Sequence, residues 1–151
     1  MRSTKVLVSL ICMGWTAMIL AAPAAAAEKK IFFLGDKPAD LPFSPAILTG
    51  GTLYISGQLA SDPVTGTFTA GSMAAQADRI IKNIEILCRK AGMDLTHVVQ
   101  ATVFITDFAE FGEFNQVFRR HFPNVPPTRA TVEVSGLARD AKIEIAAVAV
   151  K

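Results

Sequence analysis

The fold is decided near the C-terminus, by Pro126-Pro127-Thr128-Arg129-Ala130-Thr131-Val132-Glu133-Val134 and, after a short turn, by Lys142-Ile143-Glu144-Ile145-Ala146-Ala147-Val148-Ala149-Val150. β-Branched and apolar residues alternate in both runs, which are too short for helices, so both runs predict strands. Each run also carries a charge that a buried strand normally avoids, Arg129 in the first and Glu144 in the second. A buried charge is costly unless it is paired or solvated in a cavity. Two interpretations follow: a structural ion pair, or a pocket lined by both side chains.

The first 27 residues predict a secretory signal peptide. Arg2 and Lys5 form a positively charged N-terminal region, an apolar run follows, and the alanine-rich stretch 21–27 offers cleavage sites between small residues. We expect cleavage after Ala27, a single domain over residues 28–151, and a periplasmic or secreted product. The alternative is an uncleaved membrane anchor, because the leader is just long enough to span a bilayer.

Cleavage of this leader changes the net charge of the chain. The full sequence has 15 Lys and Arg against 13 Asp and Glu, and Arg2 and Lys5 leave with the leader, so 13 basic and 13 acidic residues remain. A neutral domain lacks the surplus of basic residues that nucleic acids require, and after cleavage we expect no membrane association either. Cys12 also leaves, so Cys88 cannot form an internal disulfide, and the domain has to be held by its core or by subunit assembly.

Periodicity along the remaining chain predicts the element order βββαβαββ. The expected elements are strands at 30–34, 46–49, 52–56 and 98–105, helices over 72–91 and 107–122, and the two C-terminal strands. This order indicates an α/β (α+β) fold, with one mixed sheet and both helices packed on one face. The other face is too apolar to meet water. We therefore expect several copies to assemble with their sheets facing inward.

Few residues offer chemistry. The two histidines, His97 and His121, have no partner at metal-ligand spacing, and the chain has no nucleophile elbow, P-loop or dinucleotide-binding motif. Cys88 lies on the apolar stripe of the first helix, so we interpret it as a small core residue. Arg129 has a planar fork suited to a carboxylate, and Glu144 is able to hold a water or accept a proton.

The run Pro127–Val134 followed by Lys142–Ile145 resembles the C-terminal signature of the RidA (YjgF) family. Other motifs fall in that family's order and spacing, and the resemblance extends over about residues 30–151. These motifs are Ile55-Ser56-Gly57-Gln58, the turn Asp62–Gly66, Ala74-Ala75-Gln76, Asn83, Ala91-Gly92, Thr102-Val103-Phe104 and Asn115. The resemblance implies a chorismate-mutase-like subunit in a homotrimer with a pocket at each interface. It also implies hydrolysis of reactive 2-imino and enamine acids to 2-keto acids and ammonia.

Site roles are carried over from the resemblance by position. Arg129 is expected to bind the substrate carboxylate, and Glu144 with the backbone carbonyl of Thr131 to position the attacking water. The residues expected to line the pocket are Phe43, Ser56, Gly57 and Asn115. An imine carbon is already electrophilic, so orientation of substrate and water suffices, and we expect no metal and no cofactor.

Two positions depart from the family pattern. Thr131 stands where many members have Cys, a mild change if the main-chain carbonyl carries the role. Phe43 stands where many members have Tyr, so a hydroxyl that could contact substrate is missing. The alternative function is a non-catalytic module of the same fold that holds small carboxylates. RNA cleavage, sometimes ascribed to the family, fits poorly with a neutral domain that lacks a pair of histidines.

Overall fold

The computed structural model describes residues 27–35 and 41–151. The predicted signal peptide, apart from Ala27, lies outside the described residues, and so does the alternative of a membrane anchor. Within the described ranges, no helix is both long and apolar enough to cross a membrane.

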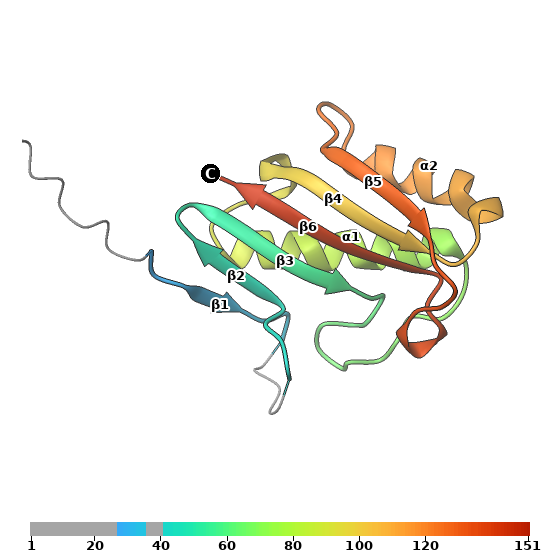
Figure 1. Ribbon diagram of the computed structural model, residues 1–151, viewed down its shortest axis with the longest axis horizontal. Coiled ribbons are helices and arrows are strands. Elements are labelled where there is room, and N and C mark those ends of the chain that lie inside the picture. The colour runs from blue at the N-terminus through green and yellow to red at the C-terminus, as the bar shows by residue number, and fades with distance from the viewer. Residues whose placement is uncertain (1–26, 36–40) are drawn as a thin grey trace, which may run out of the picture.

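A single sheet of six strands forms one layer of the molecule (Figure 1). Its strands are β1 (Lys30–Phe32), β2 (Ala46–Thr49), β3 (Thr52–Gln58), β4 (Val98–Ile105), β5 (Thr128–Glu133) and β6 (Ile143–Val150). The strand order is β1-β2-β3-β6-β4-β5. β5 runs parallel to β4 and every other pair is antiparallel, so the sheet is mixed, as predicted.

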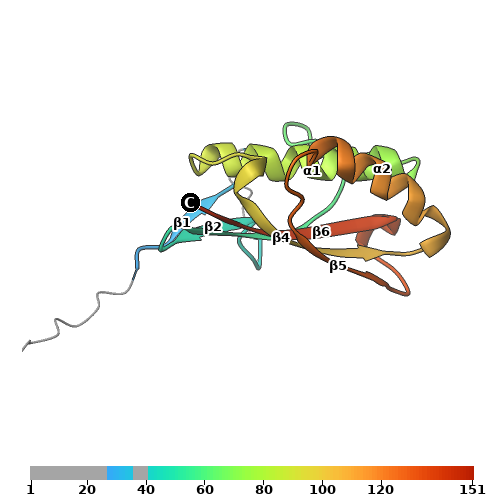
Figure 2. The ribbon, with the colours of Figure 1, turned by 90° about the horizontal axis from the view of Figure 1, so that it is seen from above.

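Two helices cover one face of this sheet, α1 (Met73–Lys90) and α2 (Phe111–His121). Seen from above, both helices lie in one layer and the sheet in the other (Figure 2). The observed order βββαβαββ and the placement of both helices on one face confirm the predicted fold class. Short 3-10 turns complete the fold at Leu95–His97, Phe108–Glu110 and Ala138–Asp140.

The boundaries of α1 follow from its sequence. Ser72 precedes the helix, and its hydroxyl accepts a hydrogen bond from the Ala75 amide at 3.2 Å. Beyond the C-terminus, Gly92 adopts a φ of +73°, which side-chain-bearing residues rarely adopt. The Gly92 amide donates to the Arg89 carbonyl, and the next amide, of Met93, donates to the Cys88 carbonyl. These two bonds form a Schellman motif, which ends the helix before Gly92.

The second helix begins later than predicted. Asp107 accepts a hydrogen bond from the Ala109 amide at 2.7 Å, but the turn that it caps is the 3-10 turn Phe108–Glu110, and α2 begins at Phe111. The Glu110 carboxylate pairs with Lys142 at 2.5 Å. The turn before α2 is therefore tied to the residue that precedes β6.

The two faces of the sheet differ in what covers them. Alternate residues of β6 (Ile143, Ile145, Ala147 and Ala149) are buried under the helices. On the opposite face, Tyr54, Val132 and Val150 are 53%, 45% and 42% exposed. We call this surface the open face. It presents apolar side chains to solvent in the single subunit, and an exposed apolar surface favours contact with another protein surface.

Candidate active site

The Arg129 side chain lies on the helix-covered face of the sheet. In the ladder it pairs with Ala101 of β4, which is buried under the helices. Its guanidinium carbon lies 5.5, 4.9 and 4.7 Å from the ring centroids of Phe111, Phe114 and Phe118. These distances are within the range of cation–π attraction. The three rings, which we call the aromatic cradle, therefore hold the arginine against α2.

A single hydrogen bond fixes the guanidinium further. Arg129 Nη2 donates to Asn115 Oδ1 at 2.8 Å. Among the described residues, no carboxylate lies within the 4.0 Å of an ion pair with Arg129. Burial lowers the pKa of Arg129 from its usual value, which still leaves the group charged at neutral pH. The result is a partly buried cation whose remaining N–H groups have no carboxylate partner in the described part of the chain.

Arg129 and Asn115 line a pocket of about 380 Å³ between α2 and the segment that leads into β5. The lining residues are Asn115, Phe118, Arg119, Pro126, Pro127 and Arg129. We call this region the arginine half of the site. Its cation and its planar fork suit a carboxylate.

Glu144 lies on the other face of the sheet. It pairs with Phe104 in the ladder, and its neighbours Ile143 and Ile145 point toward the helices. The carboxylate lies directly over the backbone of Gly57: a Cβ added to Gly57 would come 1.8 Å from Glu144 Oε1. Only glycine leaves room for Glu144 in this position. Glu144 and Gly57 form what we call the glutamate half.

The ion-pair interpretation of Arg129 and Glu144 is wrong for a single subunit. Arg129 is on β5 and Glu144 on β6, with β4 between them, and the two side chains are on opposite faces of the sheet. The interpretation of a shared pocket is likewise not met within one chain. Each half faces a different side.

Near Gly57, a groove of about 880 Å³ extends along the loop that precedes β2. Phe43, which is 54% exposed, lines this groove together with Gly57. Ser56 has a different environment from the one expected. Its hydroxyl donates to the Pro45 carbonyl at 3.1 Å and accepts from Gln58 Nε2 at 3.3 Å. The hydroxyl proton is thus used within the chain, and Ser56 fixes the loop that carries Phe43.

Thr131 shares the face of Arg129, as the alternation of β5 predicts. The Val134 amide donates to the Ile105 carbonyl of β4 at 2.8 Å. Since backbone groups alternate in direction along a strand, the Thr131 carbonyl points the other way, to the free edge of the sheet. That carbonyl is therefore placed to accept a hydrogen bond from outside the subunit. The Thr131 hydroxyl is buried without a hydrogen-bond partner in the described part of the chain.

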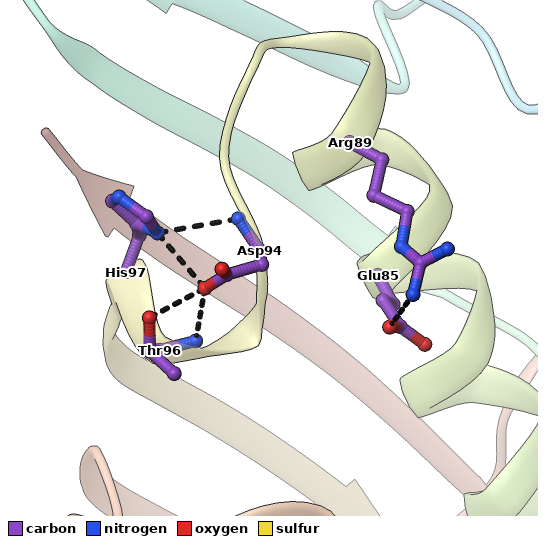
Figure 3. Close-up of polar contacts among 5 residues, drawn as sticks. All are labelled: Glu85, Arg89, Asp94, Thr96 and His97. Atoms are coloured by element: carbon purple, nitrogen blue, oxygen red, sulfur yellow. Dashed lines mark hydrogen bonds and ion pairs between the residues drawn. The ribbon is translucent and has the colours of Figure 1, made fainter.

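The two histidines make polar contacts within the fold, and Cys88 is buried in the core. His121 Nε2 lies 2.8 Å from an oxygen of Asp78, which joins α2 to α1. His97 belongs to the turn after α1, where its Nδ1 lies 3.0 Å from Asp94 Oδ1 (Figure 3). Burial raises the pKa of the Cys88 thiol to about 11, as expected for a core residue. In residues 27–35 and 41–151, no group of three or more His, Cys, Asp and Glu is placed to hold a metal ion.

Comparison with known proteins places the chain in a family. The model of the family described as Endoribonuclease L-PSP, which is the RidA/YjgF family, matches residues 35–151. The chain belongs to the RidA family. Its fold agrees with solved members. RidA from the Antarctic bacterium Psychrobacter sp. PAMC 21119 is 35% identical, with a TM-score of 0.74 over 80% of this chain and 98% of that one. The YjgF gene product of E. coli is 34% identical, with a TM-score of 0.69 over 73% and 88%.

Several RidA-family relatives are named for an activity. The 2-iminobutanoate/2-iminopropanoate deaminases of Bos taurus and Homo sapiens are 38% and 37% identical to this chain. The alignments cover 82% and 73% of this chain and 90% and 80% of the relatives. Protein DfrA of Myxococcus xanthus is 41% identical over 72% of this chain and 85% of its own length. The resemblance to imine deaminases therefore extends over most of the domain.

Sequence reasoning missed two features of this RidA-family site. Phenylalanines at spacings of three and four in the second helix are typical of a face that packs on a sheet, yet three of them also contact the Arg129 guanidinium. Their spacing of three and four residues was the available signal, but the partner lies on another element. Gly57 was expected only to line the pocket, and its contact with Glu144 depends on the pairing of β3 with β6.

Proposed function

We propose that this chain is a 2-imino and enamine acid deaminase, a metabolite-damage enzyme that hydrolyses reactive imino acids to 2-keto acids and ammonia. The observation that carries the proposal is the Arg129 guanidinium, which is partly buried and oriented but has no protein carboxylate within ion-pair distance among the described residues. An arginine held in this way is preorganised for a carboxylate ligand. The relatives named as deaminases act on 2-imino acids, which carry that carboxylate.

In the proposed reaction, Arg129 binds the substrate carboxylate through its free N–H groups, and Glu144 with the Thr131 carbonyl holds a water. The water oxygen attacks the imine carbon and passes a proton to Glu144. The C=N double bond becomes a single bond, and the nitrogen takes up the electron pair and the proton held by Glu144, which gives a carbinolamine. The carbinolamine hydroxyl then passes its proton through Glu144 to the nitrogen. Its C–O bond becomes double as the C–N bond breaks, so that a 2-keto acid and ammonia leave. The reaction requires only that the protein orient the substrate and the water and supply the charges of Arg129 and Glu144, so we propose no cofactor.

The proposed site lies between subunits of a homotrimer. Arg129 and Glu144 are on opposite faces of one sheet, so a substrate that meets both has to meet them on different chains. The free edge of β5 and the apolar open face supply surfaces on which a second copy can pack. We further propose that the assembled enzyme works in the periplasm or is secreted, because the N-terminal sequence has the pattern of a signal peptide.

The decisive experiment is a deaminase assay on residues 28–151. An amino-acid oxidase generates 2-iminopropanoate from alanine, and loss of the imine is followed above the spontaneous rate. Arg129→Ala is expected to lower kcat/KM by about 100-fold, the effect of losing a pair of charged hydrogen bonds. Arg120→Ala, at an exposed arginine of α2, is the control and should leave the rate unchanged. Equal rates for the wild type and Arg129→Ala would contradict the proposal.

A second experiment tests whether the two halves meet across an interface. Arg129→Ala and Glu144→Gln subunits, each inactive alone, are unfolded, mixed and refolded together. Random assembly leaves about a quarter of the interfaces with one intact arginine half and one intact glutamate half. Recovery of activity in the mixture supports a shared site. No recovery, with normal mixed oligomers by mass spectrometry, would contradict a site shared between subunits.

The second candidate function is a module that holds small carboxylates without turnover. Phe43 favours it, because this exposed side chain borders the groove near Gly57 without the hydroxyl of a tyrosine. Such a module predicts that a carboxylate such as 2-oxobutyrate raises the melting temperature while every assayed imine decays at its spontaneous rate. Phe43→Tyr then distinguishes the two functions, because a gain of deaminase activity shows that only the hydroxyl was missing.

A further inference from the structure

A second arginine, Arg119, lines the same pocket as Arg129. It lies on α2 four residues after Asn115, so the two side chains are on the same face of the helix. Asn115 is the residue that accepts the hydrogen bond from Arg129. Arg119 therefore follows the arginine half at the next helical turn, and the rigid segment Pro126-Pro127 borders the pocket as well.

Neither arginine is neutralised by the described part of the chain. The ion pairs there join other residues, and none of them includes Arg119 or Arg129. The lining of the pocket contains no acidic residue. Two like charges that face one pocket repel each other, and an anion bound between them relieves this repulsion. A ligand with two negative groups relieves it more fully than a ligand with one.

We propose that Arg119 is a specificity-determining residue that binds a second, distal carboxylate, so that 2-imino dicarboxylates are the preferred substrate class. This inference rests on the proposed deaminase function. The substrate's first carboxylate, next to the imine carbon, binds Arg129, and the carboxylate at the end of its side chain reaches Arg119. A pocket of about 380 Å³ is in the size range of small-molecule sites and has room for a short dicarboxylate.

The experiment compares two imines in three proteins. Oxidases generate one imine from alanine and the other from aspartate, and kcat/KM is measured for the wild type, Arg119→Gln and Arg120→Gln. Arg120 is the adjacent exposed arginine on α2 and does not line the pocket, so it matches Arg119 in charge and position on the helix. We expect the wild type to prefer the dicarboxylate. Arg119→Gln should lower kcat/KM for the dicarboxylate by about tenfold and change it less than about twofold for the monocarboxylate.

The outcomes separate this inference from the proposed function. If the wild type turns over the alanine-derived imine but the ratio of the two kcat/KM values is unchanged in Arg119→Gln, the inference is overturned and the deaminase function stands. Equal losses in Arg119→Gln and Arg120→Gln also overturn it, since they reflect net charge alone. If no imine is turned over, the proposed function fails, and the inference is judged by binding. In that case 2-oxoglutarate must raise the melting temperature more than 2-oxobutyrate in the wild type but not in Arg119→Gln.

Discussion

The arginine half and the glutamate half of the site are held in different ways. Arg129 is surrounded by side chains of α2, with three aromatic rings under the guanidinium and one amide at its edge. Glu144 lies against backbone, because its carboxylate occupies the space that Gly57 leaves free. The first half is built from packing between layers, and the second from the close approach of two strands. Substitutions in the two halves should therefore differ in the size of their effect on activity and in the kinetic constant that they change.

Gly57→Ala should have the largest effect, because it removes the space that Glu144 occupies. The new Cβ would come 1.8 Å from Glu144 Oε1, so the carboxylate has to move. The obstacle is the end of a flexible side chain, so the fold is expected to survive. A displacement of about 1 Å in a positioning group can lower a rate by about 100-fold, and we expect kcat to fall by that order.

The control is Gly112→Ala, because no atom lies within 4 Å of the Cβ that it adds. Alanine in place of an exposed helical glycine should stabilise α2 by about 0.5 to 1 kcal/mol and leave kcat unchanged. Both kcat and the melting temperature are measured for the two variants. An active Gly57→Ala enzyme would show that the observed position of Glu144 is not the one used in catalysis.

The strands that carry the two halves, and the residues of β5 that share a face, could be predicted from the sequence. The alternation of residues in 128–133 places Arg129 and Thr131 on the same face, as the structure shows. The helical periodicity of the two predicted helices indicates that they form the layer over one face of the sheet. The face of Glu144 relative to Arg129 was not predictable. It depends on β6 lying between β3 and β4, and such long-range pairing leaves no mark on the spacing of residues within either strand.

The contact between Arg129 and Phe118 was also not predictable from the sequence. Arg129 belongs to the alternating pattern of a strand and Phe118 to the helical spacing of the phenylalanines, and neither pattern alone indicates the other residue as a partner. Their contact at 4.7 Å joins residues of β5 and α2. It became visible only when the two layers were stacked.

Phe118→Leu should have a smaller effect than Gly57→Ala, because it weakens one of several contacts that orient Arg129. Leucine keeps an apolar side chain but removes the ring that lies 4.7 Å from the guanidinium. A cation–π contact contributes about 0.5 to 2 kcal/mol, which corresponds to a rise in KM of about 2- to 30-fold with little change in kcat. Steady-state kinetics on the alanine-derived imine measure both constants.

Phe122→Leu is the matched control. Phe122 is buried to a similar degree, and its ring centroid lies 4.6 Å from that of Phe118, but its ring is not among those that contact Arg129. The two variants should lose similar stability and differ in KM. Phe118→Tyr keeps a ring and should keep the wild-type KM. An equal rise in KM for both leucine variants would assign the cradle to core packing alone.

The smallest effect is expected at Asp94, which belongs to neither half. The Thr96 hydroxyl, then His97 and the Thr96 amide, lower the pKa of Asp94 from 3.8 to about 2 (Figure 3). A carboxylate whose pKa is lowered by folding adds stability above its unfolded pKa, and this contribution disappears as the pH falls toward its folded pKa. The contribution of Asp94 should therefore be full above about pH 4 and vanish near pH 2.

Asp94→Asn tests this expectation when melting temperatures are measured between pH 2 and pH 6. The wild type should melt above the variant at pH 6, and the two curves should converge as the pH falls through the window between 3.8 and about 2. Glu113→Gln, at an exposed carboxylate of α2, controls for the loss of one negative charge. Parallel curves would show that the turn does not stabilise the ionised form. Because the turn precedes β4, on a different element from both Arg129 and Glu144, kcat/KM at neutral pH should stay at the wild-type value, which separates a loss of stability from damage to either half.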